Sequence, residues 1–132
     1  MEINIHNIGD NIGPEKILLL RQPRIGLEAI VVVDNTACGP AIGGVRMVKD
    51  VTIDEVNRLA RSMTLKNAAA ALPHGGAKSG IIADPACSRE QKEMLVCAFA
   101  RMIKELTEYI PGPDMGTTKS VWVGSRRKLV ER

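Results

Sequence analysis

The alternation of helix and strand signals in the second half of the chain constrains the fold most. Thr52 with Glu55, and Ser88 with Gln91, have the capping-box spacing that begins a helix. Between these two helix starts, Gly75–Ala83 is a run of small and apolar residues that predicts a glycine-rich turn feeding a buried strand. A strand between two helices is typical of a sheet with helices packed on it.

A β-hairpin is predicted ahead of this alternation. Two apolar runs, Glu15–Gln22 and Leu27–Asp34, flank the turn-forming segment Pro23–Gly26. The other predicted elements are a Gly/Pro loop over 35–44, a short strand over 45–48, helices over 52–72 and 88–109, and an extended piece over 109–117. This order predicts one α/β domain with three-layer character, in which an N-terminal hairpin joins a mixed β-sheet and helices pack on it.

Each helix has an apolar face that should pack on the sheet. In the first helix, the predicted face is Val56, Leu59, Ala60, Met63 and Asn67. In the second helix, it is Met94, Leu95, Ala98, Phe99, Met102, Ile103 and Leu106.

Composition narrows the class of protein. Hydrophobic residues make up 45% of the 132 residues and charged residues 25%, as in an average globular domain. No apolar run reaches the roughly 20 residues that a membrane span needs, and the N-terminus lacks a signal-peptide pattern, so a cytoplasmic protein is expected. The formal charge of +3 comes from basic residues after Thr117, so the body of the chain has no basic patch for nucleic acid.

The cysteines and histidines predict no metal site. Cys38, Cys87 and Cys97 are odd in number and widely spaced, which suggests neither a disulfide framework nor a zinc site. His6 and His74 are too scattered to add ligands.

Three polar residues are candidates for chemistry. Lys66 extends the apolar face of the first helix, where it either reaches water past its neighbours or binds an anion. Lys78 lies among small residues and is either a lysine on an exposed turn or a buried base. Asp114 lies in a segment rich in proline and glycine, which is either a tight turn or a loop that carries a functional side chain.

Two nucleotide-binding motifs fail. A P-loop needs glycine directly before its lysine, but Ala77 precedes Lys78. A dinucleotide fingerprint needs GxGxxG between a strand and a helix, and Gly39–Gly44 has the wrong spacing. No cofactor is therefore expected to bind this chain unaided.

The chain carries several motifs in a fixed order. They are Gly39–Arg46 (GPAIGGVR), Met63–Pro73 (MTLKNAAAALP), His74–Gly80 (HGGAKSG), Ala83–Pro85 (ADP) and Ile110–Thr118 (IPGPDMGTT). Together these motifs resemble the N-terminal domain of the glutamate/leucine/phenylalanine/valine dehydrogenase family, in its order and at its spacing, from about Pro14 to Thr118.

The resemblance implies a role for each matching residue. Lys66 matches the lysine that pairs with the substrate α-carboxylate, and Lys78 matches the catalytic lysine that activates the attacking water. Asp114 matches the aspartate that moves protons to and from the amine and the water, and Gly43 and Gly44 match glycines whose backbone lies against the substrate. The family carries out reversible NAD(P)-dependent deamination of an L-amino acid, with the nicotinamide held in a following Rossmann domain.

The residue before the paired glycines bears on the substrate. Members of the family that use glutamate resemble one another in having a lysine there, and this chain has Ile42. An aliphatic side chain leaves a second carboxylate unpaired, which is costly when buried. We therefore expect a pocket for an aliphatic or aromatic amino acid, with Gly112 leaving space opposite Ile42; glutamate is the alternative substrate.

The resemblance predicts a domain over 1–118 and a divergent basic tail over 119–132, without a Rossmann domain. A shift in composition after Thr118 favours a frameshift or a truncation. The chain alone is then expected to be inactive, as a truncated enzyme domain that forms a homo-oligomer. The alternative is a stand-alone module for amino-acid binding or oligomerisation.

Overall fold

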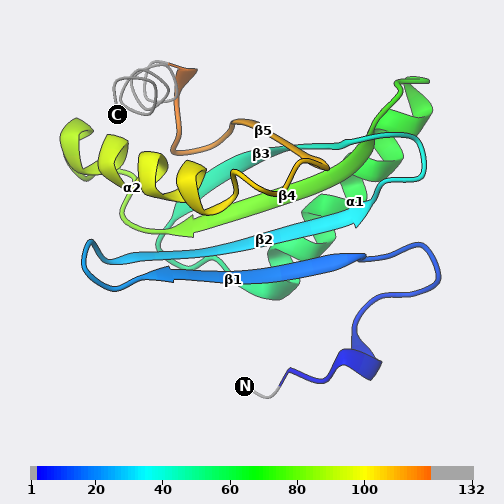
Figure 1. Cartoon of the computed structure of the whole chain (residues 1–132), viewed down its shortest axis with the longest axis horizontal. Helices are drawn as coiled ribbons and strands as arrows, with labels where there is room; N and C mark the ends of the chain where they lie inside the picture. The colour runs from blue at the N-terminus through cyan, green and yellow to red at the C-terminus, as the bar shows by residue number, and fades with distance from the viewer. Residues whose placement is uncertain (1–2, 120–132) are drawn as a thin grey trace.

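The computed structural model describes residues 3–119 and consists of one mixed sheet with a helix on each face (Figure 1). The tail predicted over 119–132 falls, apart from Lys119, outside these residues. The elements in chain order are the 3-10 helix η1 (Ile5–Asn7), β1 (Lys16–Gln22), β2 (Leu27–Asn35), β3 (Ala41–Val48), α1 (Ile53–Ala69), β4 (Gly75–Ile82), α2 (Arg89–Met102) and β5 (Tyr109–Pro113).

The strands lie in the order β1-β2-β4-β3-β5. The predicted hairpin is confirmed, since β1 and β2 pair antiparallel from Lys16 opposite Val33 to Gln22 opposite Leu27. Strand β4 lies antiparallel to β2 and parallel to β3, which is in turn parallel to β5. Both parallel connections contain a helix, as such crossovers usually do.

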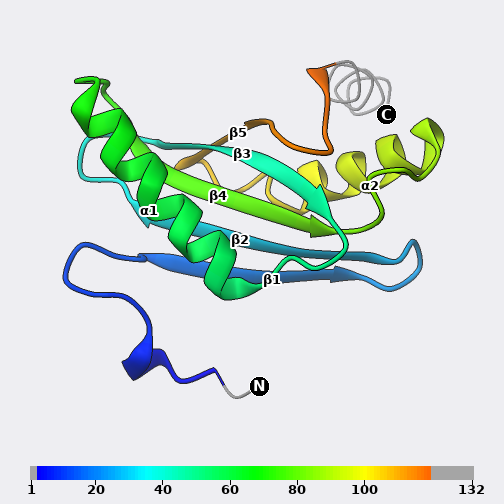
Figure 2. The same cartoon turned by 180° about the vertical axis from the view of Figure 1, so that it is seen from behind.

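The two helices cover opposite faces of the sheet, and this confirms the mixed α/β architecture. Helix α2 lies in front of the sheet in Figure 1, and α1 crosses the other face in Figure 2. On the α2 side the largest buried side chains are Phe99, Leu27, Met47, Ile81 and Val31. On the α1 side, the core consists of Ile30, Val32, Val51, Val56 and Ala60.

Both predicted helix starts are confirmed by side-chain caps. The Thr52 hydroxyl accepts a hydrogen bond from the Glu55 backbone N–H at 3.2 Å, and the Ser88 hydroxyl accepts one from the Gln91 backbone N–H at 3.1 Å. These caps satisfy backbone groups that the first helical turn leaves without a partner.

The predicted helix ends are too late. Helix α1 ends at Ala69 instead of near Leu72, because the chain turns back toward β4 through Ala71, whose φ is 55°. Helix α2 ends at Met102 instead of near Tyr109, because the turns that follow lead the chain to β5.

The face predicted for α2 is partly wrong. Met94 and Met102 are 41% and 40% exposed, whereas Val96 and Cys97 are buried. The buried stripe is centred on Leu95 and Phe99, so it is rotated from the predicted one.

The loop predicted over 35–44 is also partly wrong, because β3 begins at Ala41 and includes both paired glycines. The glycine-rich turn predicted before the buried strand is itself strand, since β4 begins at Gly75. Pairing with strands on both sides outweighs the low intrinsic preference of glycine for strands.

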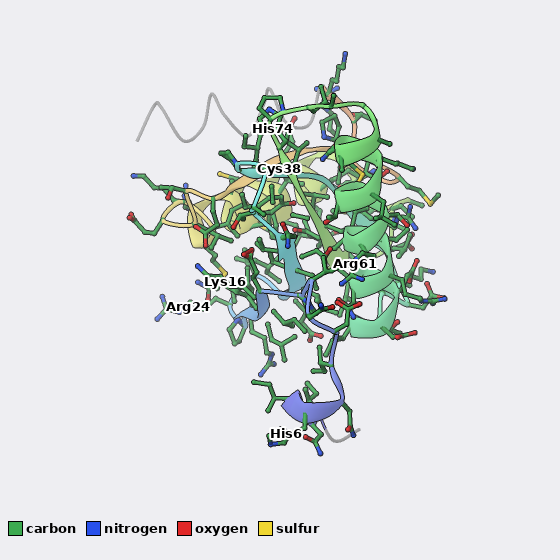
Figure 3. The ribbon with its side chains drawn as sticks, turned by 90° about the vertical axis from the view of Figure 1, so that its right-hand side faces the viewer. His6, Lys16, Arg24, Cys38, Arg61 and His74 are labelled. Atoms are coloured by element: carbon green, nitrogen blue, oxygen red, sulfur yellow. The ribbon has the colours of Figure 1, made fainter. Side chains whose placement is uncertain are left out.

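An ion-pair network centred on one buried carboxylate ties the N-terminal segment to the sheet and to α1. The Asp34 side chain is fully buried, and its Oδ2 atom lies 2.8 Å from Arg61 Nε. The same oxygen accepts a hydrogen bond from the Thr64 hydroxyl at 2.7 Å. Arg61 also donates two 2.8 Å hydrogen bonds to the Asp10 carboxylate. Figure 3 shows Arg61 on the side of α1 that faces the sheet and the N-terminal segment.

Candidate active site

The half-exposed side of β3 is the floor of the candidate site. The strand alternates strictly, with Ala41, Gly43, Val45 and Met47 buried on the α2 side. The even-numbered residues face the α1 side of the sheet, but α1 packs mainly on β4 and β2 and leaves them half-exposed. Ile42 and Gly44 of β3 and Gly112 of β5 therefore lie on one accessible surface, whereas Gly43, also predicted as a site residue, faces the α2 side.

Lys78 and Asp114 meet at this surface. Lys78 is in the middle of β4 and only 7% exposed, so the alternative of a lysine on an exposed turn is wrong. Its Nζ atom lies 2.6 Å from Oδ2 of Asp114, which follows the last residue of β5. The two residues form a close ion pair that only the sheet brings together.

The loop after β5 holds Asp114 in place. The Thr117 hydroxyl donates a 2.6 Å hydrogen bond to the Val45 carbonyl and accepts one from the Asp114 backbone N–H at 3.1 Å. The Met115 carbonyl accepts a 2.8 Å hydrogen bond from the Met47 backbone N–H. The predicted proline- and glycine-rich segment is thus anchored to β3 at two points directly after the carboxylate.

The environment of Asp114 favours its ionised form. Burial raises the pKa of the carboxyl, but the hydrogen bonds from Lys78 and from the Met115 backbone, with the charges of Lys78 and Arg46, outweigh this effect. The pKa therefore lies below its ordinary value. The carboxylate is therefore held in its charged form beside the Lys78 amino group.

This arrangement requires glycine at positions 43 and 44, because neighbouring atoms leave no room for a side chain at either position. A Cβ atom at Gly43 would lie 1.6 Å from the Ala77 carbonyl oxygen, and one at Gly44 would lie 2.7 Å from the Asp114 Cβ atom. The first glycine lets β3 approach β4, and the second leaves room for Asp114 above the strand.

The register corrects the expected position of Gly112. Gly112 pairs with Gly44, and the residue opposite Ile42 is Ile110. A Cβ atom at Gly112 would have nothing within 4 Å, so space exists there, next to Gly44 instead of directly opposite Ile42. Ile42 is half-buried in β3, and Ile110 is 41% exposed.

Lys66 lies on the flank of α1 that faces β3. It follows Glu55 by about three helical turns, so both residues occupy the same side of the helix. Glu55 pairs with Arg46 of β3 at 3.2 Å, which fixes the direction of that side. Lys66 is exposed, and its ammonium group forms no ion pair within residues 3–119. It lies at the border of the surface without touching the Lys78–Asp114 pair.

Sequence reasoning missed Arg46, although it belongs to a matching motif. Arg46 Nε lies 3.3 Å from Asp114 Oδ2, the oxygen that Lys78 also contacts. The available signal was the alternation of β3, which places Arg46 on the same face as Gly44.

Sequence reasoning also missed a hydroxyl network directly below the site. The buried Ser79 hydroxyl donates to the Tyr109 hydroxyl at 2.8 Å, and the Tyr109 hydroxyl donates to the Gly43 carbonyl at 3.0 Å. Burial raises the pKa of Tyr109 well above its usual range. The network links β4, β3 and β5 where Lys78 and the paired glycines lie.

We expect Tyr109→Phe to lower the free energy of unfolding by about 1–3 kcal/mol, because it leaves buried polar atoms at Ser79 and Gly43 without their partner. Urea denaturation of the two chains measures this difference. A Tyr109→Phe chain as stable as the parent would show that the hydroxyl network does not hold the three strands together.

The described residues do not form a dinucleotide site. Such a site needs a glycine-rich turn between a strand and a helix N-terminus. Within residues 3–119, the connections from β3 to α1 and from β4 to α2 contain no glycine. In the same part of the chain, no group of three or more histidine, cysteine or acidic side chains could hold a metal ion. No helix among the described residues has the length and apolar character to cross a bilayer.

Comparison with known proteins identifies relatives with this fold. The chain is 41% identical to leucine dehydrogenase of Geobacillus stearothermophilus over 109 residues, which cover 79% of this chain and 29% of that protein. It is 33% identical to phenylalanine dehydrogenase of Thermoactinomyces intermedius over 130 residues, which cover 95% of this chain and 35% of that protein. The chain thus spans about a third of the length of the curated relatives it matches.

Solved structures agree with these matches. The hetero-hexameric glutamate dehydrogenase from Thermus thermophilus, in its Leu bound form, superposes with a TM-score of 0.80 at 33% identity, over 89% of this chain and 32% of that one. The family model described as Glu/Leu/Phe/Val dehydrogenase, dimerisation domain, matches residues 14–123. This match confirms the family resemblance and extends past Thr118. The chain therefore belongs to the Glu/Leu/Phe/Val dehydrogenase family, of which it contains the dimerisation domain.

Proposed function

We propose that this chain provides the amino-acid-binding surface of a dehydrogenase that converts an L-amino acid to a 2-oxo acid and ammonia. The observation that carries the proposal is the 2.6 Å contact between Lys78 and Asp114 on the glycine-lined surface of β3. A lysine and a carboxylate within proton-transfer distance, with open space over Gly112, suit a reaction that moves protons between water and an amine.

Each residue has a role in the proposal. Lys66 is exposed at the border of the surface and supplies a cation for the α-carboxylate of the amino acid. Lys78 activates the water, and Asp114 exchanges protons with the amine and the water. Gly43 and Gly44 present backbone against the substrate. Gly44 has no side chain on the substrate face, whereas Gly43 faces the α2 side and lets β3 lie close to β4.

We propose an aliphatic or aromatic amino acid as the substrate. The surface next to Gly44 and Gly112 carries Ile42 and Ile110, which face each other across β3 and β5. These side chains give a second carboxylate no partner, so a glutamate side chain would be desolvated at a cost.

A nicotinamide cofactor, NAD or NADP, belongs to the proposed whole enzyme. The strand-to-helix connections within residues 3–119 contain no glycine, which supports a proposal in which these residues do not hold the cofactor. The proposal therefore assigns these residues amino-acid binding and proton transfer alone. A cytoplasmic location is part of the same proposal. The chain's three cysteines, Cys38, Cys87 and Cys97, are free thiols.

Calorimetric titration of the 132-residue chain with L-leucine and with L-glutamate tests the proposal. We expect leucine to bind more tightly than glutamate. We expect Lys66→Ala to weaken leucine binding by roughly 10- to 100-fold, because one charged hydrogen bond is lost. The matched control is Arg58→Ala on the same helix, where the cation is exposed and pairs with Asp54.

Three results would speak against parts of this proposal. Tighter binding of glutamate would contradict the apolar pocket. Equal leucine binding by Lys66→Ala and the parent would contradict the role of Lys66. No binding of either amino acid would leave oligomerisation as the function of this chain.

Homo-oligomer formation is the second proposed function, and an apolar groove beside the sheet edge favours it. The groove has a volume of about 310 Å³ and lies between the N-terminal segment and β1, the edge strand of the sheet. Ile3, Ile5 and Leu19 line it and are 50%, 79% and 56% exposed. Exposed apolar side chains beside an open strand edge are suited to contact another copy of the chain. Sedimentation of the chain over a range of concentrations measures this association.

A further inference from the structure

A chain of four alternating charges crosses the candidate site. Glu55 of α1 pairs with Arg46 of β3 at 3.2 Å, Arg46 contacts Asp114 at 3.3 Å, and Asp114 contacts Lys78 of β4 at 2.6 Å. The first two side chains are only 34% and 20% exposed. Resemblance gave roles to Lys78 and Asp114, but it gave none to Arg46 or Glu55.

We propose that Arg46, held by Glu55, is a positioning residue that keeps the Asp114 carboxylate against Lys78 in the proposed dehydrogenase reaction. This inference rests on the proposed function for its place in the reaction, and on geometry for the positioning itself. Arg46 uses two different nitrogens of its guanidinium group, Nε toward Asp114 and the NH1 group toward Glu55. A planar guanidinium can bridge two carboxylates in fixed directions, which a lysine ammonium cannot do with the same geometry.

The helix cap accounts for the backbone N–H of Glu55 but not for the position of its side chain. Its backbone N–H completes the cap of α1 at Thr52, while its carboxylate turns to Arg46. The pair therefore joins the first turn of α1 to the middle of β3. Because Arg46 lies two residues after Gly44 on the same face, its guanidinium reaches the carboxylate that lies above that glycine.

The charged and titratable groups around Asp114 come from four elements. Lys78 faces it from β4 and Arg46 from β3, and Glu55 of α1 acts behind Arg46. Tyr109 of β5 is buried and lies near enough for the Asp114 charge to act on it. Lys78 and Arg46 both contact Oδ2 of Asp114. The negative charge of Glu55 partly offsets the positive charge of Arg46. Removing Arg46 should make Asp114 easier to protonate, and removing the charge of Glu55 should make it harder.

Carbon-13 NMR of the Asp114 side-chain carboxyl in the full 132-residue chain tests this inference without any ligand. We expect the titration midpoint of Asp114 to rise in Arg46→Gln and to fall in Glu55→Gln. In the double variant, the effect of Glu55→Gln should largely vanish, because Glu55 acts through Arg46. Arg58→Gln is the control, since it removes an exposed cation of α1 that pairs with Asp54 instead of with the four charges of the site, and it should leave the midpoint unchanged.

The outcomes separate positioning from a structural role. If Arg46→Gln lowers the melting temperature but leaves the Asp114 midpoint unchanged, Arg46 only stabilises the fold and the inference is overturned. If Glu55→Gln shifts the midpoint equally with and without Arg46, the bridge between them is overturned. If Arg46→Gln does not fold, Glu55→Gln decides alone, and a midpoint that does not fall overturns the inference. Absence of leucine binding would contradict the proposed function while leaving these midpoints measurable.

Discussion

Arg61→Ala is expected to lower the free energy of unfolding by about 3–5 kcal/mol, because it leaves a buried carboxylate without its cation. The Asp34 side chain is fully buried, and Arg61 Nε lies 2.8 Å from its Oδ2 atom. The Thr64 hydroxyl remains as a hydrogen-bond donor to that oxygen, but it carries no charge. Urea denaturation followed by circular dichroism measures the loss.

The same substitution also releases the N-terminal segment. The Arg61 hydrogen bond, together with backbone N–H groups of Ile12 and Gly13, holds the pKa of Asp10 well below its usual range. Asp10→Asn should therefore destabilise the chain less than Arg61→Ala, since Asp10 is exposed and water can replace its partner.

Arg58→Ala is the matched control on the same helix. The Arg58–Asp54 pair is 73% and 80% exposed, so its removal should change stability by no more than about 0.5 kcal/mol. Similar losses in Arg61→Ala and Arg58→Ala would mean that the buried network contributes no more than a surface ion pair.

Gly43→Ala is expected to lower the free energy of unfolding by about 3 kcal/mol, the upper part of the usual range for overpacking. The added Cβ atom would lie 1.6 Å from the Ala77 carbonyl oxygen. That oxygen belongs to the backbone of β4, which is paired on both sides and cannot move aside alone. Strands β3 and β4 must separate, and this displaces the backbone next to Lys78.

Gly112→Ala is the matched substitution, with the same added methyl group at a place that has room for it. A Cβ atom there has nothing within 4 Å, so stability should change by no more than about 0.5 kcal/mol. Under the proposed function the methyl group occupies the space for the amino acid, and leucine binding should weaken in a correctly folded chain. Equal stability of Gly43→Ala and Gly112→Ala would contradict the close approach of the two strands.

Local patterns were enough to predict much of the fold. The hairpin follows from two apolar runs around a turn, and the helix starts follow from Thr52 and Ser88, whose hydroxyls bond only three residues ahead. These interactions join neighbours in the sequence, so the sequence pattern specifies them. The helix ends were predicted less well. Helix α1 ends at Ala69 and α2 at Met102 because the chain must then turn to reach β4 and β5, and no local pattern marks those turns.

In the candidate site, too, the sequence predicted which residues take part but not how they are arranged. Motifs of the family marked Lys66, Lys78 and Asp114, and the glycine pair, from sequence alone. They did not indicate that Lys78 is a buried strand residue, or that Gly112 lies beside Gly44 instead of Ile42. Register between distant strands is set by the whole sheet, so no local pattern carries it.

By itself, the sequence determined the family, the order of the elements and the residues available for chemistry. Only the tertiary structure decided which of those residues touch. Arg46 and Asp114 are 68 residues apart in sequence. Arg46 and Lys78 both contact the same Asp114 oxygen, because β3 lies between β4 and β5. The physical reason is that a charge pair of this kind needs strands paired across the sheet, and their order and register follow from burying both apolar faces at once.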